Sequence, residues 1–387
     1  MNFSVSFYAA RYCCRVPFSL LPAAMRGTMF FVALQGLSAA AEPAPPHHAV
    51  GAVAKAGADH DGEFADFSQW KDVSAFIEQM VTRHGFARTE LDALFRQTRY
   101  VESSKQLIKP APAGKPKNWR AYRARFVDPV RINSGVQFWL DNQDALSRAE
   151  SQFGVPAEII VAIIGVETVY GRNTGNFRVM DSLTTLAFDY PDTPTRAARM
   201  EFFRGELENT LLFAREAAID PMSLQGSYAG AIGLPQFMPS SIRQFAIDFN
   251  NDGKIDLRNT PADAIGSVAN FLVHHGWHAG EPTVFPTLVS PADGNGARSW
   301  DAFIGQGLEA KFSVTELKAG GVIPATPLPE GMLFGLIDLQ NGAEAPEYWL
   351  GGANFFAITQ YNRSYFYAMS VVDLARAVRT TRSVDAP

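Results

Sequence analysis

The sequence contains very little cysteine, since Cys13 and Cys14 are the only two in 387 residues. They are adjacent and lie near the start, so they cannot join distant parts of the chain, and no disulfide framework is predicted. The sequence also lacks an excess of basic charge: 34 lysine and arginine residues face 39 aspartate and glutamate residues, for a formal net charge of -5. Without a general basic character to neutralise phosphates, nucleic acid is not an expected partner.

The apolar stretch near the start, Met29 to Leu37, is too short to cross a bilayer. It follows an arginine and is followed by small residues up to Ala41, which is the order of a signal peptide. We therefore expect residues 1–41 to be a signal peptide and residues 42–63, rich in proline, alanine and glycine, to be a linker. A retained membrane anchor and a buried N-terminal helix are the alternatives, and Met25 is an alternative start.

Hydrophobic residues make up 47% of the chain and charged residues 19%, which is the composition of a globular protein. Helical spacing of apolar residues predicts a helical region at 64–120, further helices through most of 121–280, and a last helix within 356–380. Residues 281–355 are rich in proline, glycine and β-branched residues, which indicates a small β-rich insert. The predicted fold class is α+β, mainly α.

One glutamate stands at the end of a strongly apolar helix. Pro156 suits a helix start, and residues 159–166 are all apolar, so this helix should be surrounded by protein. Glu167 follows directly; on a continued helix it lies below Tyr170, with no base one turn away to pair it. A carboxyl group held there loses hydration and its pKa rises, as a general acid near neutral pH requires.

A second interpretation of the same glutamate stays open. The helix could end at Gly165 or Thr168, and Glu167 would then face solvent or pair with Arg172. Spacing alone does not decide between a catalytic acid and a charge at a helix end.

The segment around this glutamate, Gly165-Val-Glu-Thr-Val-Tyr-Gly171, resembles the catalytic motif of the lytic murein transglycosylase B family, a branch of the lysozyme-like superfamily. Further stretches resemble that family in the same order along the chain: Tyr122–Phe126, Val155–Ile160, Gly226–Ser241, Asp263–Asn270 and Gln360–Ser364. A lone motif would be weak, whereas several long motifs in order are specific. The resemblance covers roughly residues 66–379 and implies a lysozyme-like catalytic core.

The resemblance implies an enzyme that cleaves the bond between N-acetylmuramic acid and N-acetylglucosamine in peptidoglycan. Glu167 would be the single acid/base, which protonates the glycosidic oxygen and then takes a proton from the muramic C6 hydroxyl. The product ends in a 1,6-anhydromuramic residue, and no water is consumed. Ordinary glycosidases use two carboxylates, whereas here the N-acetyl oxygen of the substrate would meet the positive charge. No cofactor is implied for catalysis.

Six further residues match family positions at the substrate site: five lie in or around the cleft, and Arg199 falls where the family places an arginine near the peptide stem. They are Tyr122, Ser227, Gln236, Asn362, Tyr367 and Arg199. The two tyrosines lie among apolar residues, so core tyrosines with satisfied hydroxyls are the alternative. An insertion, residues 192–196, precedes Arg199, and an exposed helix charge is the alternative there.

Residues 248–256 follow the opening of a calcium-binding EF-hand loop, with oxygen side chains at positions 1, 3 and 5 and glycine at position 6. Position 12 is Asn259 instead of the usual glutamate. The resemblance implies a variant loop with a later carboxylate and a structural Ca²⁺ ion, whose ligands would be Asp248, Asn250, Asp252, the Lys254 carbonyl and Asp263. A simple turn between helices is the alternative.

Three functions compete: the transglycosylase, a hydrolytic muramidase, and a noncatalytic murein-binding scaffold or calcium-dependent module. The expected location is exported and periplasmic, with no stable membrane anchor after signal cleavage. Peptidoglycan glycan strands are the expected partners, and cell-wall synthesis proteins are further candidates. The sequence leaves open endolytic or exolytic action, the preferred peptide stem and the oligomeric state.

Overall fold

The computed structural model describes residues 67–110, 114 and 116–385. The predicted signal peptide (1–41) and linker (42–63) lie outside the described residues. Within the described part, helices predominate and the sheets are small and antiparallel. The prediction of a mainly helical α+β fold is confirmed.

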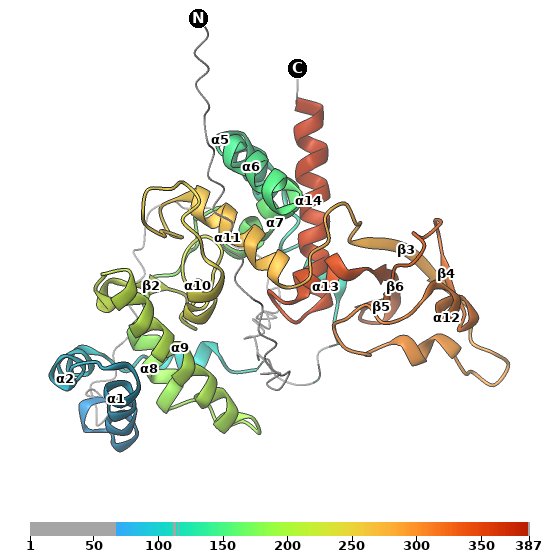
Figure 1. The fold of residues 1–387 in the computed structure, drawn as a ribbon. Helices are drawn as coiled ribbons and strands as arrows, with labels where there is room; N and C mark the ends of the chain where they lie inside the picture. Colours follow the sequence, from blue (N-terminus) through green and yellow to red (C-terminus); the bar gives the residue numbers. More distant parts are fainter. Residues whose placement is uncertain (1–66, 111–113, 115, 386–387) are drawn as a thin grey trace, which may run out of the picture. The chain divides into compact units, whose positions relative to one another are not determined.

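Three helices near the N-terminal end of the described chain pack on a helical pair from further along (Figure 1). The three are α1 (Lys71–His84), α2 (Arg88–Gln97) and α3 (Glu102–Leu107), and the pair is α8 (Val179–Phe188) and α9 (Arg196–Glu216). α1 ends where Gly85 adopts the left-handed conformation, with φ 66°. The carboxylate of Asp181 in α8 accepts the backbone N–H of Arg99 at 2.9 Å, which ties the two groups together.

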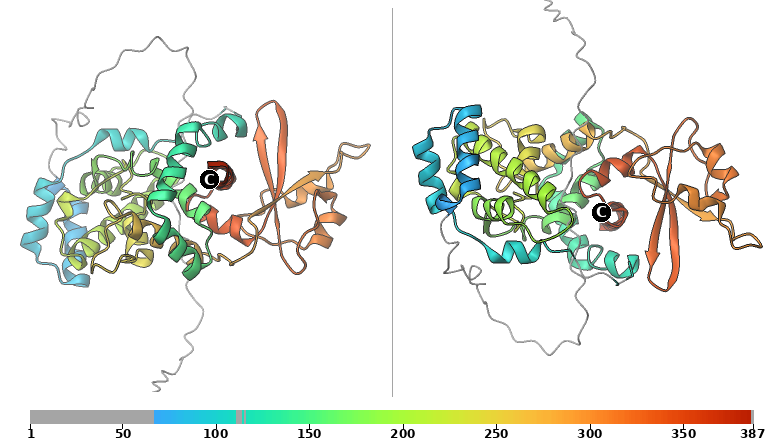
Figure 2. Two further views of the ribbon diagram at one scale, coloured as in Figure 1. Left: turned by 90° about the horizontal axis from the view of Figure 1, so that it is seen from above. Right: turned by 90° about the horizontal axis from the view of Figure 1, so that it is seen from below.

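Figure 2 shows the C-terminal helix end-on, with green helices beside it. The apolar helix α7 (Ala157–Thr168) is buried among other helices. Its neighbours are α5 (Pro129–Asp141), α6 (Gln143–Phe153), α11 (Pro261–His274) and α14 (Tyr365–Asp385). Every residue from 159 to 166 is buried, as the apolar run predicts. α14 begins near the predicted position but continues past residue 380, and the short helix α13 (Ala353–Thr359) precedes it.

A compact segment of turns joins α9 to α11. It contains the strand β2 (Gln225–Gly226), paired with β1 (Phe177–Arg178), and the helix α10 (Pro239–Phe245). Gly226 is required here, because a Cβ atom at that position would lie 2.1 Å from the carbonyl oxygen of Ala231. The chain can therefore fold tightly back on itself beside the end of α7.

The β-rich insert forms a four-stranded antiparallel sheet in the order β4-β3-β6-β5. The strands are β3 (Val284–Val289), β4 (Val322–Pro324), β5 (Gly335–Asn341) and β6 (Glu344–Gly351), and the helix α12 (Val314–Ala319) packs on β4. A separate apolar cluster that includes Trp300, Leu317 and Phe334 stabilises the insert. The sheet joins the helices through β5, which contacts α14 and the short helix α4 (Trp119–Arg123).

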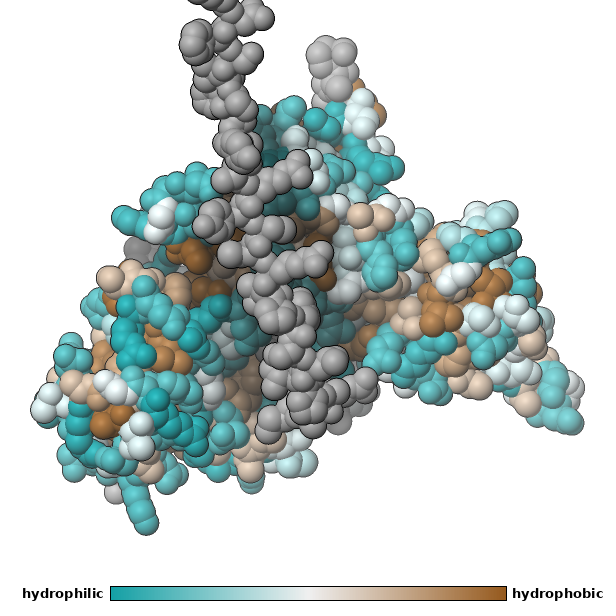
Figure 3. All heavy atoms as spheres, in the orientation of Figure 1, coloured by the Kyte–Doolittle hydropathy of each residue, from teal (hydrophilic) through white to brown (hydrophobic). Residues whose placement is uncertain are grey.

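Most of the face shown in Figure 3 is hydrophilic, with hydrophobic side chains visible between the polar ones. Exposed apolar residues of the insert include Leu288 and Ile323, which lie opposite each other on β3 and β4. In the described residues, no single helix has both the length and the apolar character to span a membrane. The bent pair α6 and α7 meets that test only when the two helices are taken together.

Candidate active site

Glu167 lies in the last turn of α7, one residue before the helix ends at Thr168. The expectation that Tyr170 continues the same helical face is wrong, because Val169 turns into the left-handed conformation and redirects the chain. The end at Thr168 was part of the alternative interpretation, but the rest of that interpretation does not hold. In the described part of the chain Glu167 forms no ion pair with Arg172, and its partner is Tyr367, whose hydroxyl donates to Oε1 at 2.6 Å.

Burial raises the pKa of Glu167 from 4.5 to about 7, and the hydrogen bond from Tyr367 offsets part of that rise. The physical cause is that the apolar turn below the carboxyl group removes water, while a hydroxyl donor favours the charged form. Glu167 keeps some exposure to a pocket and is therefore reachable. A carboxyl group with this pKa holds its proton near neutral pH and can also release it.

A pocket that opens to solvent lies beside Glu167. It brings together four of the predicted site residues, which are Glu167, Ser227, Gln236 and Asn362. Apolar side chains, among them Phe237 and Met238, form much of the remaining wall. Such a pocket suits a sugar, which has an apolar ring face and polar edges.

Two polar side chains of the wall are held in fixed orientations. The Ser227 hydroxyl oxygen accepts the backbone N–H groups of Ala229 at 3.3 Å and Ala231 at 3.1 Å, which leaves its own proton for an acceptor in the pocket. The Gln236 amide nitrogen donates to the Gly233 carbonyl at 2.9 Å and the Thr174 carbonyl at 3.2 Å. Both side chains are therefore presented by backbone contacts rather than left free to rotate.

The sequence left open whether Tyr122 and Tyr367 belong to the cleft or to the core. Tyr367 is 3% exposed and packs in the core, yet its hydroxyl contacts Glu167. Tyr122 is partly buried against Phe366, and its pKa rises to about 12, first through burial and then through the nearby charge of Glu167. Tyr367 is thus a core tyrosine whose hydroxyl binds the acid, whereas Tyr122 is half-buried and only feels the charge of Glu167.

Arg199 lies apart from the residues that line the pocket. Its guanidinium packs on three rings, with distances to the ring centroids of 5.6 Å for Tyr190, 5.1 Å for Phe202 and 5.2 Å for Phe203. It is partly buried, so it differs from the freely exposed helix charge that was its alternative. The structure does not bring it into contact with Glu167.

The acidic loop is folded by hydrogen bonds from its own side chains to its backbone. Side-chain oxygens of Asp248 and Asn250 both accept the backbone N–H of Asp252, at 3.2 and 3.1 Å. The buried Asp263, from α11, accepts three backbone N–H groups of the loop, those of Phe249, Asn250 and Asp256. Within the described ranges, no group of three or more histidine, cysteine, aspartate or glutamate side chains is placed to hold a metal ion.

The chain is similar to known proteins over most of its length. The model of the transglycosylase SLT domain family matches residues 67–376. The chain belongs to this family. It is 42% identical over 327 residues to the membrane-bound lytic murein transglycosylase B of Escherichia coli strain K12, covering 82% of this chain and 85% of that one.

Two solved structures of transglycosylases resemble the fold closely. The soluble lytic transglycosylase SltB1 of Pseudomonas aeruginosa is 44% identical, with a TM-score of 0.72, and the match covers 81% of this chain and 99% of that one. The lytic transglycosylase Slt35 of Escherichia coli, in complex with calcium, is 41% identical, with a TM-score of 0.72, and the match covers 82% and 96%. The family resemblance drawn from the motifs is confirmed.

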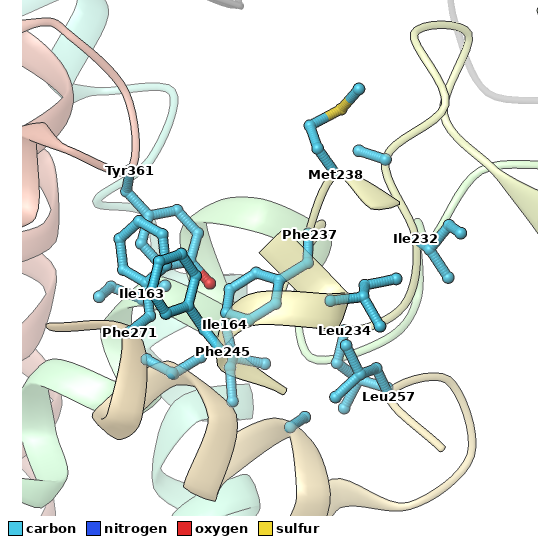
Figure 4. Close-up of a cluster of buried hydrophobic side chains, with 14 of the residues drawn as sticks. Ile163, Ile164, Ile232, Leu234, Phe237, Met238, Phe245, Leu257, Phe271 and Tyr361 are labelled. Carbon is cyan, nitrogen blue, oxygen red and sulfur yellow. The ribbon is translucent and has the colours of Figure 1, made fainter. Parts of the chain in front are cut away.

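Tyr361 is a residue of this transglycosylase site that was not predicted from the sequence. Tyr361 lines the pocket, and its hydroxyl donates to the Pro235 carbonyl at 3.0 Å. Figure 4 shows Tyr361 beside Phe271 and Phe237, within the buried cluster under the pocket. The signal was present, because Tyr361 directly precedes the predicted Asn362, but an aromatic residue in an apolar context predicts only burial.

Replacing Tyr367 with phenylalanine should change the pH range of the enzyme. The hydroxyl of Tyr367 lowers the pKa of Glu167, so Tyr367→Phe is expected to raise that pKa further. The alkaline limb of the pH profile for kcat/KM on a soluble glycan should then move to higher pH. A limb that stays in place or moves to lower pH would show that the hydroxyl does not stabilise the ionised acid.

Proposed function

We propose that Glu167 is the acid/base of this enzyme and that the pocket around it binds the glycan strand. Members of the family are lytic transglycosylases: the enzyme cleaves the β-1,4 bond between N-acetylmuramic acid and N-acetylglucosamine in peptidoglycan without hydrolysis and forms 1,6-anhydromuramic ends. The observation that carries the assignment is a single carboxyl group with a pKa of about 7, at the end of a buried helix and open to a pocket.

The reaction uses Glu167 twice. The neutral carboxyl group first donates its proton to the glycosidic oxygen as the bond from C1 of the muramic residue breaks. The resulting carboxylate then accepts the proton of the C6 hydroxyl while that oxygen forms the new bond to C1. Between these two proton transfers Glu167 is ionised, and the hydrogen bond from Tyr367 stabilises this form.

The described wall of the pocket offers no second carboxylate to act as a nucleophile. Among the described residues that line the pocket, Glu167 is the only acid. The charge that develops at C1 is met by the N-acetyl oxygen of the substrate, as in substrate-assisted glycosidases. We assign Ser227, Gln236 and Asn362 to hydrogen bonds with the sugar. Tyr122 is not among the residues that line the pocket, and we assign it to the aromatic packing near Glu167.

Mass spectrometry of the digestion products tests the reaction. Purified murein digested with the enzyme should release muropeptides with anhydro ends, each lighter by one water than the hydrolytic product. Products with reducing ends would identify a muramidase, and the absence of soluble products under conditions that keep the protein folded would identify a scaffold. The same digest with Glu167→Gln is the blank.

We also place the enzyme in the periplasm, with residues 1–41 as its signal peptide. A cell-wall substrate supports export, and the order of charge, apolar core and small residues supports cleavage near Ala41. Because the Escherichia coli relative is named membrane-bound, a retained anchor is the competing arrangement. The N-terminal sequence of the protein recovered from a periplasmic extract separates the two, since cleavage would begin the mature chain at about residue 42.

We further propose that the loop of residues 248–263 binds a structural Ca²⁺ ion. Asp248, Asn250, Asp252 and the Lys254 carbonyl would supply oxygen ligands, and Asp263 would complete the set from α11. The carboxylates of Asp248, Asp252 and Asp263 are not gathered around one point in the structure, and the oxygens of Asp263 accept loop N–H groups, so binding requires these side chains to turn toward the ion. The curl of oxygens around the Asp252 N–H suits a hard cation. The Slt35 structure named as a calcium complex supports the same chemistry for a relative. The ion would hold the loop in place and take no part in the reaction.

Calcium should therefore stabilise the protein through mass action. At about 100 times its dissociation constant, a ligand of the folded state adds about 2.7 kcal/mol to the free energy of unfolding. The melting temperature should rise with calcium in the wild type and not in Asp252→Ala. Asn259→Ala, which alters a loop residue outside the proposed ligand set, should keep the rise. A wild type that is insensitive to calcium would contradict the site.

A further inference from the structure

The chain directly after Glu167 adopts an unusual backbone conformation. Val169, Tyr170 and Gly171 have φ values of 51°, 58° and 90°, so three successive residues are left-handed. Only glycine adopts this region freely, and a β-branched residue such as Val169 is strained there. A strained turn persists only when the surrounding structure holds it in place. The residues that contact this turn therefore also fix the chain next to Glu167.

The ring of Tyr170 fills a space that two glycines leave open. A Cβ atom on Gly135 of α5 or on Gly165 of α7 would lie 2.4 Å from the Tyr170 hydroxyl oxygen. The ring also packs on Phe138, with centroids 5.3 Å apart. Within the described chain the buried hydroxyl has no hydrogen-bond partner. Tyr170 is therefore held in place by packing alone, and its ring fixes the turn against α5 and α7.

Thr168 joins that turn to the segment that carries Gln236. Its side chain is fully buried, and the hydroxyl donates to the Leu234 carbonyl at 2.9 Å, with a longer contact of 3.2 Å to the Ile164 carbonyl. The same oxygen accepts the N–H of Gly171 at 3.1 Å. One hydroxyl thus connects the end of α7, the left-handed turn and the segment that carries Gln236.

A second contact links the same two parts of the chain. Gln236 is itself left-handed, with φ 51°, and its amide nitrogen donates to the carbonyl of Thr174, which follows the turn. The Thr168 contact lies two residues before Gln236 and the amide contact lies at Gln236. The two hydrogen bonds hold residues 234–236 against the end of α7 and the turn that follows it. Loss of either bond would let Gln236 move relative to Glu167.

We propose that Thr168 is a positioning residue for the reaction. Its hydroxyl sets the separation between Glu167 and Gln236 by holding the Leu234 carbonyl, and the Tyr170 ring keeps the strained turn in the shape that this contact needs. The inference rests on the proposed roles of Glu167 and Gln236. An acid displaced by about 1 Å from the reacting oxygen can lose about 100-fold in rate, so a hydroxyl outside the pocket can govern turnover.

The paired variants Thr168→Val and Thr168→Ser test this directly. Valine keeps the shape and removes the hydroxyl, whereas serine keeps the hydroxyl and removes a methyl group. On a soluble glycan fragment, Thr168→Val should lower kcat by about 10- to 100-fold with KM changed by less than about twofold. Thr168→Ser should restore kcat to within about threefold of the wild type.

A merely structural role predicts different results. Thr168→Val would then lower the melting temperature but leave kcat of the folded protein unchanged, or Thr168→Ser would lose as much kcat as the valine variant. Either result overturns the proposal. Failure of the proposed function looks different, because Glu167→Gln would then remain active whatever happens at Thr168.

The Tyr170 variants keep the proposal open to refutation even if Thr168→Val does not fold. Tyr170→Phe should keep the wild-type kcat, because the hydroxyl it loses has no hydrogen-bond partner within the described chain. Tyr170→Leu leaves the space between Gly135 and Gly165 unfilled and should lower kcat about tenfold with KM unchanged. Wild-type kcat in Tyr170→Leu would contradict the anchoring role.

Discussion

Glu167→Gln is expected to fold as the wild type does and to release soluble muropeptides from murein about 10² to 10⁴ times more slowly. The carboxamide keeps the size of the side chain and accepts the hydrogen bond from Tyr367, but it has no proton to donate to the glycosidic oxygen. The rate of muropeptide release, measured by chromatography near pH 6, gives the ratio directly.

Glu158→Gln is the matched control. Glu158 belongs to the same helix, in its first turn, and pairs with the exposed Arg379; it is not among the residues that line the pocket. This variant should keep nearly all of the activity, because surface ion pairs contribute little and the residue is far from the reacting bond. Equal losses in the two variants would show that the effect comes from α7 as a whole.

Glu167→Gln should also stabilise the protein, and only at alkaline pH. Because the folded pKa of Glu167 is about 7 and its ordinary value is 4.5, the folded state keeps a proton in this interval that the unfolded chain has lost. Stability is therefore lost as pH rises from about 4.5 through 7. Each pKa unit corresponds to about 1.4 kcal/mol, and partial exposure to the pocket reduces the total.

At pH 8 Glu167 of the wild type is therefore a poorly hydrated carboxylate. The glutamine of the variant is neutral in the same place. Glu167→Gln should raise the free energy of unfolding by about 1–3 kcal/mol at pH 8 and change it little at pH 4. Urea unfolding of both proteins at each pH measures the difference, and the other titrating groups cancel in the comparison. A variant that is less stable at pH 8, or equally stabilised at both pH values, would contradict a buried acid with a raised pKa.

The apolar helix and its terminal acid could be predicted because both depend on local sequence. Residues 159–166 are apolar without interruption, and only a helix surrounded by protein can bury such a stretch. Desolvation of the next residue follows from its position alone, and burial is indeed the largest influence on the Glu167 pKa. The turn after Thr168 could not be predicted, since neither Val169 nor Tyr170 favours the left-handed region.

The partners of Glu167 depend on contacts between distant parts of the chain. Tyr367 lies 200 residues away in the sequence, and periodicity indicates that it is buried without saying which group its hydroxyl meets. Ser227, Gln236 and Asn362 were found through the family resemblance, because small and polar residues in a turn predict only a turn. Tyr361 was missed for the same reason: its tie to the Pro235 carbonyl spans 126 residues.

The most direct test is a titration of Glu167 in the folded protein. The infrared difference spectrum between the wild type and Glu167→Gln isolates the carboxyl stretch of this one side chain across the pH range. A general acid enclosed by its helix should remain protonated through pH 6 and titrate with a midpoint of about 7. A carboxylate that is already ionised at pH 6, with a midpoint near 4.5, would contradict the assignment of Glu167 as the proton donor.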